Sequence, residues 1–433
     1  MIDIDYLRKN PQIVKNKSKD KGYDIDVDLI LEIDEKRREV LAKIESSRQQ
    51  RNELAAQGKT NNRSPEFIQQ AKDIKQNLTK MDDEFKELDL KFITLMREIP
   101  NMALDDVPLG ETENDNVVSK KVGNPTEFSF KPKSHHELAE SLDLIDTVRA
   151  VKISGSRFAY IKNDLVKLQF AIINFVMDSL SDESLIKKLI EENNLSVVPK
   201  PFVPVLPPAL IKTEPYVASA RLNAEEVTYK VEQDDLWLNA SAEHSLCTMY
   251  WNEILADELL PIRYIGYSTS FRREAGTYGK DTEGIFRMHQ FDKLEMEVFS
   301  SPETGLEEHY LLIAIQEYLM QKLKLPYRVL QKCTADIGKP NARGIDIEVW
   351  LPGQNQYRET HTADYMTDYQ SRDLKIRSKK PSEETRFVHT NDATAFALGR
   401  IMIAIMENYQ TEGGQINIPE ALWPYMSGKK VIG

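Results

Sequence analysis

The sequence predicts an α+β protein, in which an N-terminal antiparallel helical hairpin precedes a larger domain with a mainly antiparallel β-sheet flanked by helices. A heptad pattern of apolar residues runs through residues 67–95. Strand-like segments begin after residue 134, and most of them are joined by hairpins or long connecting segments. Strands and helices do not alternate regularly, which favours an antiparallel sheet. We expect residues 1–105 to form the helical arm, with its hairpin at about 28–98, and residues 106–433 to form the second domain.

The composition is that of a globular protein and excludes several classes. The 433 residues include 57 Lys and Arg against 69 Asp and Glu, which gives a net charge of −12. Cys247 and Cys333 are too few for a disulfide scaffold and suit the reducing cytoplasm. The apolar run at 401–406 is far shorter than the roughly 20 residues of a membrane helix, and the N-terminus lacks the apolar core of a secretory signal. We therefore expect a cytoplasmic protein with no membrane partner, and the acidic total argues against a surface coated in basic charge for nucleic acid.

The hairpin is the clearest periodic feature. Its second helix carries apolar residues spaced alternately by four and three, as in the seam of a coiled coil: Phe67, Ala71, Ile74, Leu78, Met81, Phe85, Leu88, Phe92 and Leu95. A thinner seam runs through 29–57, and the segment GKTNNRSP at 58–65 interrupts both helices because it is rich in turn formers. Two helices of about 30 residues would make an arm about 45 Å long.

Charge is distributed unevenly along this arm. The tip segment, residues 46–80, has seven basic and three acidic residues, or 7 − 3 = +4. The two stems of the arm, residues 28–45 and 81–98, each have more acidic than basic residues. A hairpin that is positive at its end suits contact with a polyanion. Two other interpretations stay open at this point, an unevenly charged solvated face and a dimerisation arm.

Residues 100–134 are rich in Pro, Asn, Asp and Gly and predict a linker. Beyond it we predict helices at 165–180, 307–322 and 389–408 and strands at 263–272, 291–299, 327–330 and 346–351. The sequence contains no G-x-G-x-x-G, Walker A, H-E-x-x-H or C-x-x-C motif, which removes the main support for dinucleotide-binding, P-loop and zinc-protease functions.

Three polar clusters could form a catalytic or ligand-binding site. The first, at 267–299, concentrates Arg, Gly and Glu on one hairpin, where arginines could clamp phosphates, although ordinary surface ion pairs would explain any single residue. The second, at 346–370, offers Glu348 and Glu359 as oxygen ligands for Mg²⁺. In the third, at 389–400, Arg400 lies two to three turns into an otherwise apolar helix and must be paired or bind a ligand.

Together these clusters resemble the class II aminoacyl-tRNA synthetases and, among them, the seryl-tRNA synthetases. The segments SFRREAG (270–276), FRMHQFDKLE (286–295), GSRFAYIK (155–162), ALGR (397–400) and INIPEALWPYM (416–426) occur in the family's order. The resemblance covers essentially the whole chain and implies a class II catalytic domain, ATP and Mg²⁺ as cofactors, and a homodimer. It also implies activation of L-serine as seryl-adenylate, followed by transfer to tRNA(Ser), and to tRNA(Sec) in a host that has one.

The resemblance implies roles for individual residues. Arg272 would contact the α-phosphate and the serine carboxylate, Glu274 and Phe291 would bind adenine, and Arg287 and Arg400 would hold the outer phosphates. Arg272 and Arg400 are the expected catalytic residues, and Glu359 and Thr362 the expected Mg²⁺ ligands. The complete ATP set adds Arg273, Thr360 and His361. The expected serine-binding set is Ser241, Ala242, Glu243, Arg272, Glu295, Asp392 and Thr394, and the expected tRNA-binding set is Arg48, Arg51, Lys59, Arg63, Lys72 and Lys75.

The chain departs from the family near the amino-acid pocket. His361, Thr362, Ala363, Asp364 and Tyr365 stand where the family usually has S-S-C-S-N, and Asp392 replaces the usual Asn. Ser241 for Thr, and Thr394 at a position of Ser or Thr, conserve a hydroxyl, whereas Asp392, His361 and Tyr365 change charge or bulk. One alternative is therefore an enzyme with altered amino-acid specificity or a carrier other than tRNA. Another is a non-catalytic binding protein, against which the retained Arg272, Glu274, Arg287, Glu359 and Arg400 speak.

Overall fold

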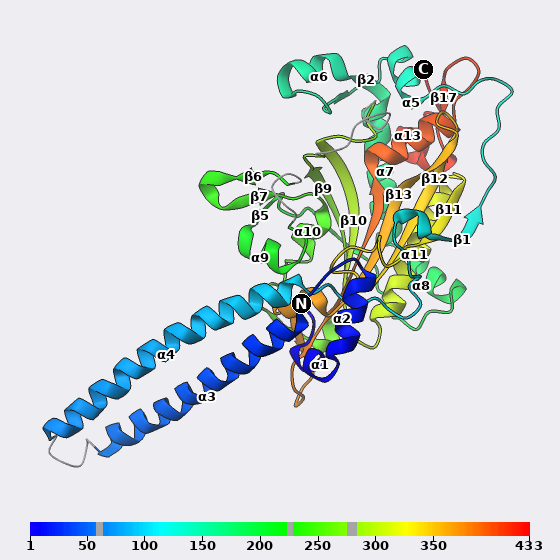
Figure 1. Ribbon diagram of the computed structural model, residues 1–433. Helices are drawn as coiled ribbons and strands as arrows, with labels where there is room; N and C mark the ends of the chain where they lie inside the picture. The colour runs from blue at the N-terminus through cyan, green and yellow to red at the C-terminus, as the bar shows by residue number, and fades with distance from the viewer. Residues whose placement is uncertain (58–63, 223–227, 275–283) are drawn as a thin grey trace. The chain divides into compact units, whose positions relative to one another are not determined.

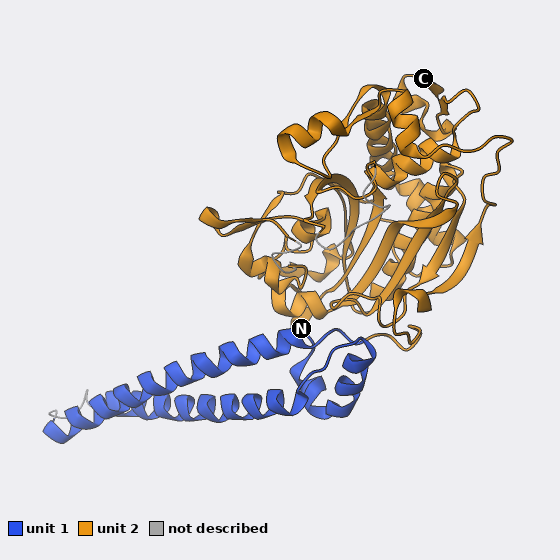
Figure 2. Ribbon diagram, turned by 45° about the horizontal axis from the view of Figure 1, so that its top comes forward, with its two compact units in different colours: residues 1–102 blue, residues 103–433 orange. Residues whose placement is uncertain are grey.

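The structure is a computed structural model that describes residues 1–57, 64–222, 228–274 and 284–433. The chain divides into two compact units, residues 1–102 and 103–433 (Figure 2). The helical arm and the mainly antiparallel sheet predicted from the sequence are both confirmed (Figure 1).

In its described residues, the first unit contains four helices and no strand. Its helices are α1 (Ile4–Lys9), α2 (Pro11–Asp20), α3 (Val27–Gln57) and α4 (Pro65–Glu98). Helix α4 begins as its sequence predicts, because the Ser64 hydroxyl accepts a hydrogen bond from the Phe67 amide and Pro65 occupies the first turn. The heptad residues of α4 face α3, and buried Leu78 packs with Val40 and Ile44. The packing of this seam therefore holds the two long helices together, as in a coiled coil.

An eight-stranded sheet forms the centre of the second unit. Its order is β1-β11-β12-β13-β16-β10-β9-β4, and every pairing is antiparallel except that of β4 with β9. The strands are β1 (Val117–Val122), β4 (Val203–Val205), β9 (Ile262–Phe271), β10 (Gln290–Ser300), β11 (Tyr327–Gln331), β12 (Arg343–Leu351), β13 (Gln356–Thr367) and β16 (His389–Ala397).

Helices cover one face of this sheet and leave the other face for the site. The three main helices are α7 (Asn163–Ser181), α11 (Gly305–Lys322) and α13 (Leu398–Asn408). Their apolar side chains share one core with Leu294, Met296 and Val298 of β10. Because side chains alternate along a strand, Lys293, Glu295 and Glu297 project from the opposite face. None of the described helices combines the length and apolar character that crossing a membrane requires.

Shorter elements complete the unit. The small sheets pair β2 (Ile145–Asp146) with β3 (Tyr160–Ile161), β5 (Leu210–Lys212) and β6 (Lys230–Val231) with β7 (Leu236–Leu238), β8 (Ile254–Ala256) and β15 (Arg386–Phe387) with β14 (Arg377–Lys379), and β17 (Ile416–Asn417) with β18 (Val431–Ile432). The shorter helices are α5 (His135–Ser141), α6 (Thr147–Ser154), α8 (Glu183–Glu192), α9 (Thr213–Ala218), α10 (Ala242–Leu246) and α12 (Tyr369–Leu374).

One predicted helix was half wrong. Residues 389–408 are the central strand β16 followed by α13, not a single helix. Strand β16 lies between β10 and β13, which supply the backbone hydrogen bonds that a helix would have made internally. Its small residues, Ala393 and Ala395, allow close packing in the buried centre of the sheet. Pairing with these two strands, which are distant in sequence, therefore outweighs the local helical pattern.

Candidate active site

A cavity of about 280 Å³ opens on the face of the sheet opposite α7, α11 and α13. It is lined by the ends of β9 and β10, by β13 and β16, and by the start of α13. Nine of the residues predicted for the site line it, although they come from four distant segments of the sequence: Arg272, Glu274, Arg287, Phe291, Glu359, Thr360, Thr362, Thr394 and Arg400. The cavity is therefore bordered by three arginines and two glutamates, together with the rings of Phe286 and Phe291.

Arg272 follows the last residue of β9 and is fixed by the backbone around it. Its Nε donates to the carbonyl oxygen of Ala240 at 3.0 Å, and its guanidinium lies 5.3 Å from the ring centroid of Phe291. Its own backbone N–H donates to the carbonyl of His289 at 2.9 Å. The side chain thus enters the cavity between an aromatic face and the segment that leads to α10, in an orientation set before any ligand arrives.

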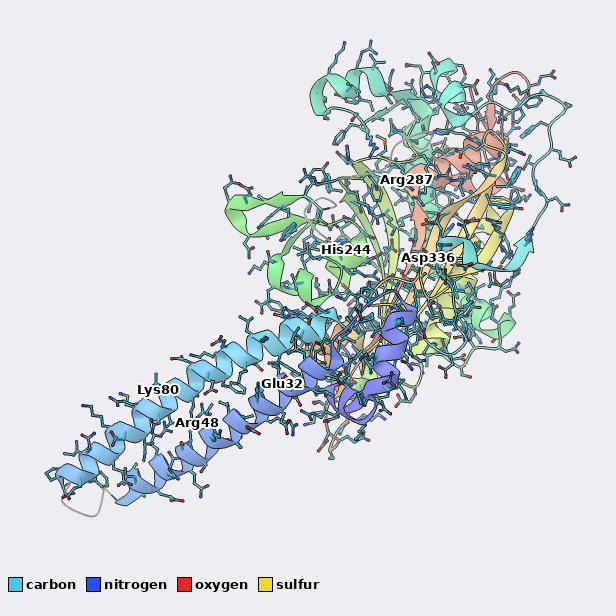
Figure 3. All side chains as sticks on the ribbon, viewed as in Figure 1. Glu32, Arg48, Lys80, His244, Arg287 and Asp336 are labelled. Atoms are coloured by element: carbon cyan, nitrogen blue, oxygen red, sulfur yellow. The ribbon has the colours of Figure 1, made fainter. Side chains whose placement is uncertain are left out.

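A second arginine, Arg287, borders the same cavity. Its Nη1 lies 3.3 Å from the Glu274 carboxylate, so this ion pair joins the segment after β9 to the segment before β10. Arg287 comes from the segment that leads into β10 (Figure 3). Arg400 stacks over Phe286 from the start of α13, at 5.0 Å from the ring centroid. Three guanidinium groups at one opening suit a polyphosphate.

The predicted magnesium ligands lie on β13, where the strand has a bulge. The register between β12 and β13 shifts at this point, so Glu348 pairs with Glu359 whereas Ile347 pairs with His361. A bulge re-aims side chains, and here Glu359 and Thr360 both line the cavity. Glu359 Oε1 lies 3.1 Å from Arg400 Nη1, and 48% of its side-chain surface still faces the open cavity.

Glu359 is held ionised by its neighbours. The crowded wall of the cavity desolvates the carboxylate, which disfavours its charge, but the positive charges of Arg400 and Lys332 outweigh this and lower its pKa to about 2. Together with the Thr362 hydroxyl on the same wall, it offers an all-oxygen donor set. Such donors fit Mg²⁺, which takes one or two protein oxygens and completes its shell with phosphates and water.

The cavity ends at Lys293 and Thr394, and behind them lies a buried polar cluster. The Lys293 ammonium lies 2.7 Å from Glu295 Oε2 and 3.7 Å from Glu243 Oε2, and it donates to the Ser241 hydroxyl at 3.1 Å. The Thr394 hydroxyl donates to Glu295 Oε1 at 3.1 Å. Carboxylates and hydroxyls at this spacing can bind a small molecule that carries an ammonium and a hydroxyl group.

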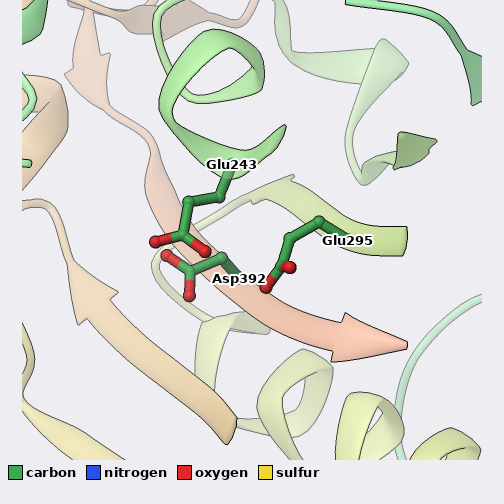
Figure 4. Close-up of side chains that lie close together, drawn as sticks. All are labelled: Glu243, Glu295 and Asp392. Atoms are coloured by element: carbon green, nitrogen blue, oxygen red, sulfur yellow. The ribbon is translucent and has the colours of Figure 1, made fainter. Parts of the chain in front are cut away.

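Three carboxylates converge in this cluster. Oxygens of Glu243, Glu295 and Asp392 all lie within 4.8 Å of one another, and the three side chains approach from α10, β10 and β16 (Figure 4). Burial raises the pKa of Glu295, Glu243 adds to the effect and Lys293 opposes it, giving a pKa of about 8. Burial acts the same way on Glu243, but Arg221 and Lys293 outweigh it and hold the pKa of Glu243 well below its usual value. At neutral pH, Glu295 therefore holds a proton and Glu243 does not.

Three predicted site residues lie neither in the lining of the cavity nor in the polar cluster behind it. Arg273 is exposed, with its guanidinium 5.5 Å from the ring centroid of Tyr229. His361 is fully buried, shares a hydrogen bond of 2.8 Å with the Thr360 hydroxyl, and packs against Phe396. The strand alternation turns His361 toward the helix-covered face, so the geometry gives no support to its predicted contact with ATP. Ala242 is buried in α10 and supports the position of Glu243.

Three further residues belong to the site and were not predicted. Lys293 and Arg221 reach the carboxylate cluster, and the Phe286 ring lies between the guanidiniums of Arg358 and Arg400, at 4.1 and 5.0 Å. Lys293 could have been found, because it lies two residues before Glu295 and so shares its face of β10. Nothing in the sequence pattern indicates Arg221, which lies far along the chain from its partners.

The arm residues predicted to bind tRNA are exposed where the structure describes them. Arg48, Arg51, Lys72 and Lys75 are exposed on α3 and α4, and Figure 3 labels Arg48 together with Lys80 of the same segment. Arg48 forms an ion pair of 3.1 Å with Asp82 across the hairpin. Lys59 and Arg63 lie outside the described residues.

Known proteins resemble this chain along its whole length. Residues 1–103 match the family model of the seryl-tRNA synthetase N-terminal domain, and residues 229–409 match that of the class II tRNA synthetase core domain (G, H, P, S and T). A serine–tRNA ligase of Nitrosopumilus maritimus is 37% identical over 437 residues, with all of both chains covered.

The chain belongs to the seryl-tRNA synthetase family.

Solved structures of this family agree with the fold. The seryl-tRNA synthetase of Pyrococcus horikoshii complexed with ATP superimposes with a TM-score of 0.86 at 38% identity, covering 100% of this chain and 99% of that one. The cytoplasmic serine–tRNA ligase of Naegleria fowleri in complex with AMP gives a TM-score of 0.84 at 28% identity, covering 100% and 98%. The chain is thus an aminoacyl-tRNA ligase by family, with the helical arm and antiparallel catalytic sheet of seryl-tRNA synthetases.

Proposed function

We propose that this chain is a serine–tRNA ligase, which forms seryl-adenylate from L-serine and ATP and transfers the seryl group to tRNA(Ser). The observation that carries the proposal is the junction at Lys293 and Thr394, where a cavity lined by arginines meets a buried cluster of carboxylates and hydroxyls. The arginine-lined side suits the phosphates of ATP, and the cluster suits an amino acid with a short hydroxylated side chain. Arg272 lines the cavity beside this junction.

The first step is a displacement at phosphorus. A carboxylate oxygen of serine attacks the α-phosphorus of ATP, the bond to the bridging oxygen breaks, and pyrophosphate leaves with that bonding pair. Arg272 would hold both the carboxylate and the α-phosphate and stabilise the charge that develops on the phosphorane oxygens. Phe291 and Glu274 would hold the adenine, and Arg287 and Arg400 the departing phosphates. No side chain has to act as a nucleophile, because positioning and charge stabilisation suffice.

The second step transfers the seryl group. A hydroxyl of the 3′-terminal ribose of tRNA attacks the carbonyl carbon of seryl-adenylate, loses its proton, and AMP leaves. Glu243, Glu295, Ser241 and Thr394 would keep the amino acid in place through both steps. Transfer of labelled serine to tRNA tests the proposal, with periodate-oxidised tRNA as the control that must stay uncharged. Adenylate formation without charging of intact tRNA would instead favour a different carrier.

Glu359 and Thr362 would hold Mg²⁺, which would reduce the repulsion between the phosphates and the attacking carboxylate. The ionised Glu359 is paired with Arg400 in the structure. We infer that this pair would separate when ATP binds, since Arg400 would hold the outer phosphates and Glu359 the metal.

Substituting Glu359 tests the metal site. We expect Glu359→Gln to lower the rate of adenylate formation about a hundredfold and to raise the Mg²⁺ concentration needed for half-maximal rate, since an amide is a weaker metal ligand. Pyrophosphate exchange measured against Mg²⁺ concentration checks this. Glu348→Gln is the matched control, because the Glu348 carboxylate forms an ion pair with Arg328 outside the cavity. This variant should retain the normal Mg²⁺ dependence. Equal Mg²⁺ curves for both variants would remove Glu359 from the metal site.

The high pKa of Glu295 predicts a pH dependence of serine binding. The free protein holds a proton on Glu295 below about pH 8, and the serine ammonium favours the ionised carboxylate, so binding must release that proton. We therefore expect the KM for serine to fall as the pH rises toward about 8, by up to about tenfold per unit. Calorimetry in buffers of different ionisation enthalpy should detect the released proton.

The control for this prediction is Glu295→Gln. This variant should bind serine weakly, with little dependence on pH and no proton release. Serine binding to the unchanged protein without proton release would show that Glu295 is already ionised or does not meet the ammonium.

For the remaining partners we propose that the arm contacts tRNA(Ser), and tRNA(Sec) where a host has one, mainly through phosphates and shape. We also propose a homodimer that acts in the cytoplasm. Exposed apolar residues on the catalytic unit support an assembly, among them Val148, Ile153, Val203 and Leu206. Both cysteines are buried and unpaired, as suits a reducing compartment.

A further inference from the structure

Arg221 lies in the segment after α9 and reaches the carboxylate cluster from outside the cavity. Its Nη2 forms an ion pair with the Asp392 carboxylate, and its Nε lies 3.6 Å from Glu243 Oε1. Nη2 also lies 3.7 Å from the sulfur of Met366. Only 13% of the side-chain surface of Arg221 is exposed. It thus neutralises an aspartate that stands where the family usually has an uncharged asparagine.

The charges of the cluster can be counted from these contacts. Glu243, Glu295 and Asp392 contribute three negative charges when ionised, and Arg221 and Lys293 contribute two positive ones, so the sum is 2 − 3 = −1. Burial raises the pKa of Asp392, and its ion pair with the Arg221 guanidinium opposes this effect and favours the ionised carboxylate. Burial, reinforced by the charge of Asp392, raises the pKa of neighbouring Glu297 well above its usual value, which keeps that side chain neutral. A single ammonium group balances the remaining charge. The proton that Glu295 holds in the free protein balances it when no amino acid is bound.

We propose that Arg221 is a specificity-determining residue of the amino-acid pocket: by neutralising Asp392 it leaves room for one positive charge, and so selects an amino acid whose side chain is uncharged. The proposal rests on the proposed function, because it takes this cluster as the amino-acid site. Without Arg221 the cluster has a charge of −2. With serine, the remaining charge is then balanced only by a proton on Asp392, whose pKa burial already raises, whereas an amino acid of the same size with a second ammonium balances the charge by itself. L-2,3-Diaminopropionate, in which an ammonium replaces the serine hydroxyl, is that amino acid.

The test measures pyrophosphate exchange with serine and with L-2,3-diaminopropionate in the full-length chain and in three variants. We expect Arg221→Gln to lower kcat/KM for serine at least tenfold and to shift the ratio of the two substrates toward diaminopropionate at least tenfold. Adding Asp392→Asn to Arg221→Gln returns the charge to −1, and should restore the serine preference to within about threefold. Arg221→Lys keeps the charge and should keep the preference.

Each other result would overturn the inference. If Arg221→Gln lowers exchange with both substrates equally, Arg221 acts through shape and not charge. The same conclusion follows if the double variant prefers serine no more than Arg221→Gln does. ATP binding by equilibrium dialysis reports folding, since Arg221 does not line the ATP cavity. If Arg221→Gln does not fold, a loss of serine preference in Arg221→Lys or in the double variant would still contradict the proposal. A failure of the proposed function looks different, because then the unchanged chain would not prefer serine.

Discussion

Replacing Arg272 by alanine is expected to lower the rate of adenylate formation at least about a thousandfold, which corresponds to about 4 kcal/mol of lost transition-state stabilisation. The side chain lines the cavity, is oriented by the Ala240 carbonyl and the Phe291 ring, and lies beside the junction of the two subsites. Its removal would leave the developing charge on the α-phosphate without its nearest fixed cation. Single-turnover formation of labelled adenylate measures the effect, and tRNA binding should be nearly unchanged.

The adjacent arginine provides the control. Arg273 has the same charge, but it is exposed and directed to Tyr229 outside the cavity. Arg273→Ala should therefore change the adenylate rate by no more than a fewfold. Similar rates for the two variants, or a normal rate for Arg272→Ala, would refute the role assigned to Arg272.

The second large effect concerns the arm. Neutralising Arg48, Arg51, Lys72 and Lys75 together should weaken tRNA binding by about two to three orders of magnitude at low salt. It should also reduce the slope of log K against log salt by about 3, because each phosphate contact releases close to one counterion. Arg48 has to leave its ion pair with Asp82 to contribute, so its single substitution should have the smallest effect of the four. Filter binding across a salt series gives both quantities.

The matched control neutralises the same number of basic residues on the stems of the arm, away from the tip segment. Lys36, Lys43, Lys86 and Lys91 are exposed on the stems of α3 and α4. Neutralising these four should leave the salt slope within about one unit of normal. A tip variant with an unchanged slope would show that the tip segment is not the contact surface. Equal effects of the two sets would show that only total charge matters.

Much of the fold could be predicted because its pattern is local. The seam of α4 repeats over several turns, and Ser64 and Pro65 are a helix start that depends on neighbours in sequence. Strand β16 could not be predicted in the same way, because its hydrogen bonds come from β10 and β13, about 100 and 30 residues away. The composition and spacing of 389–397 are compatible with a helix until those partners are known.

In the site, too, some residues could be predicted from the sequence and others depend on contacts formed only in the folded chain. Arg272, Arg287 and Glu359 could be named from their residue types and from the family resemblance, and the fold brings them to one cavity. His361 was expected to contact ATP, but it lies between Thr360 and Thr362, which line the cavity, so alternation along β13 directs its side chain to the other face. Arg221 could not be found, since its partners Asp392 and Glu243 meet it only in the folded chain.

The total charge of −12 was a poor guide to partners, because total charge says nothing of distribution. Positive charge gathers at the tip segment of the arm and along the cavity, and these are the places where the proposed function requires phosphate contacts. The acidic remainder would repel RNA that binds nonspecifically.

The most direct test of the central claim is ATP–pyrophosphate exchange measured with serine, alanine, glycine and threonine. We expect serine to exceed alanine and glycine by about four orders of magnitude in kcat/KM, because alanine and glycine lack the side-chain hydroxyl that the buried hydroxyls and carboxylates around Thr394 would bind. Threonine should be rejected less strongly, since it retains the hydroxyl. Exchange with alanine, glycine or threonine that equals or exceeds exchange with serine would contradict the account.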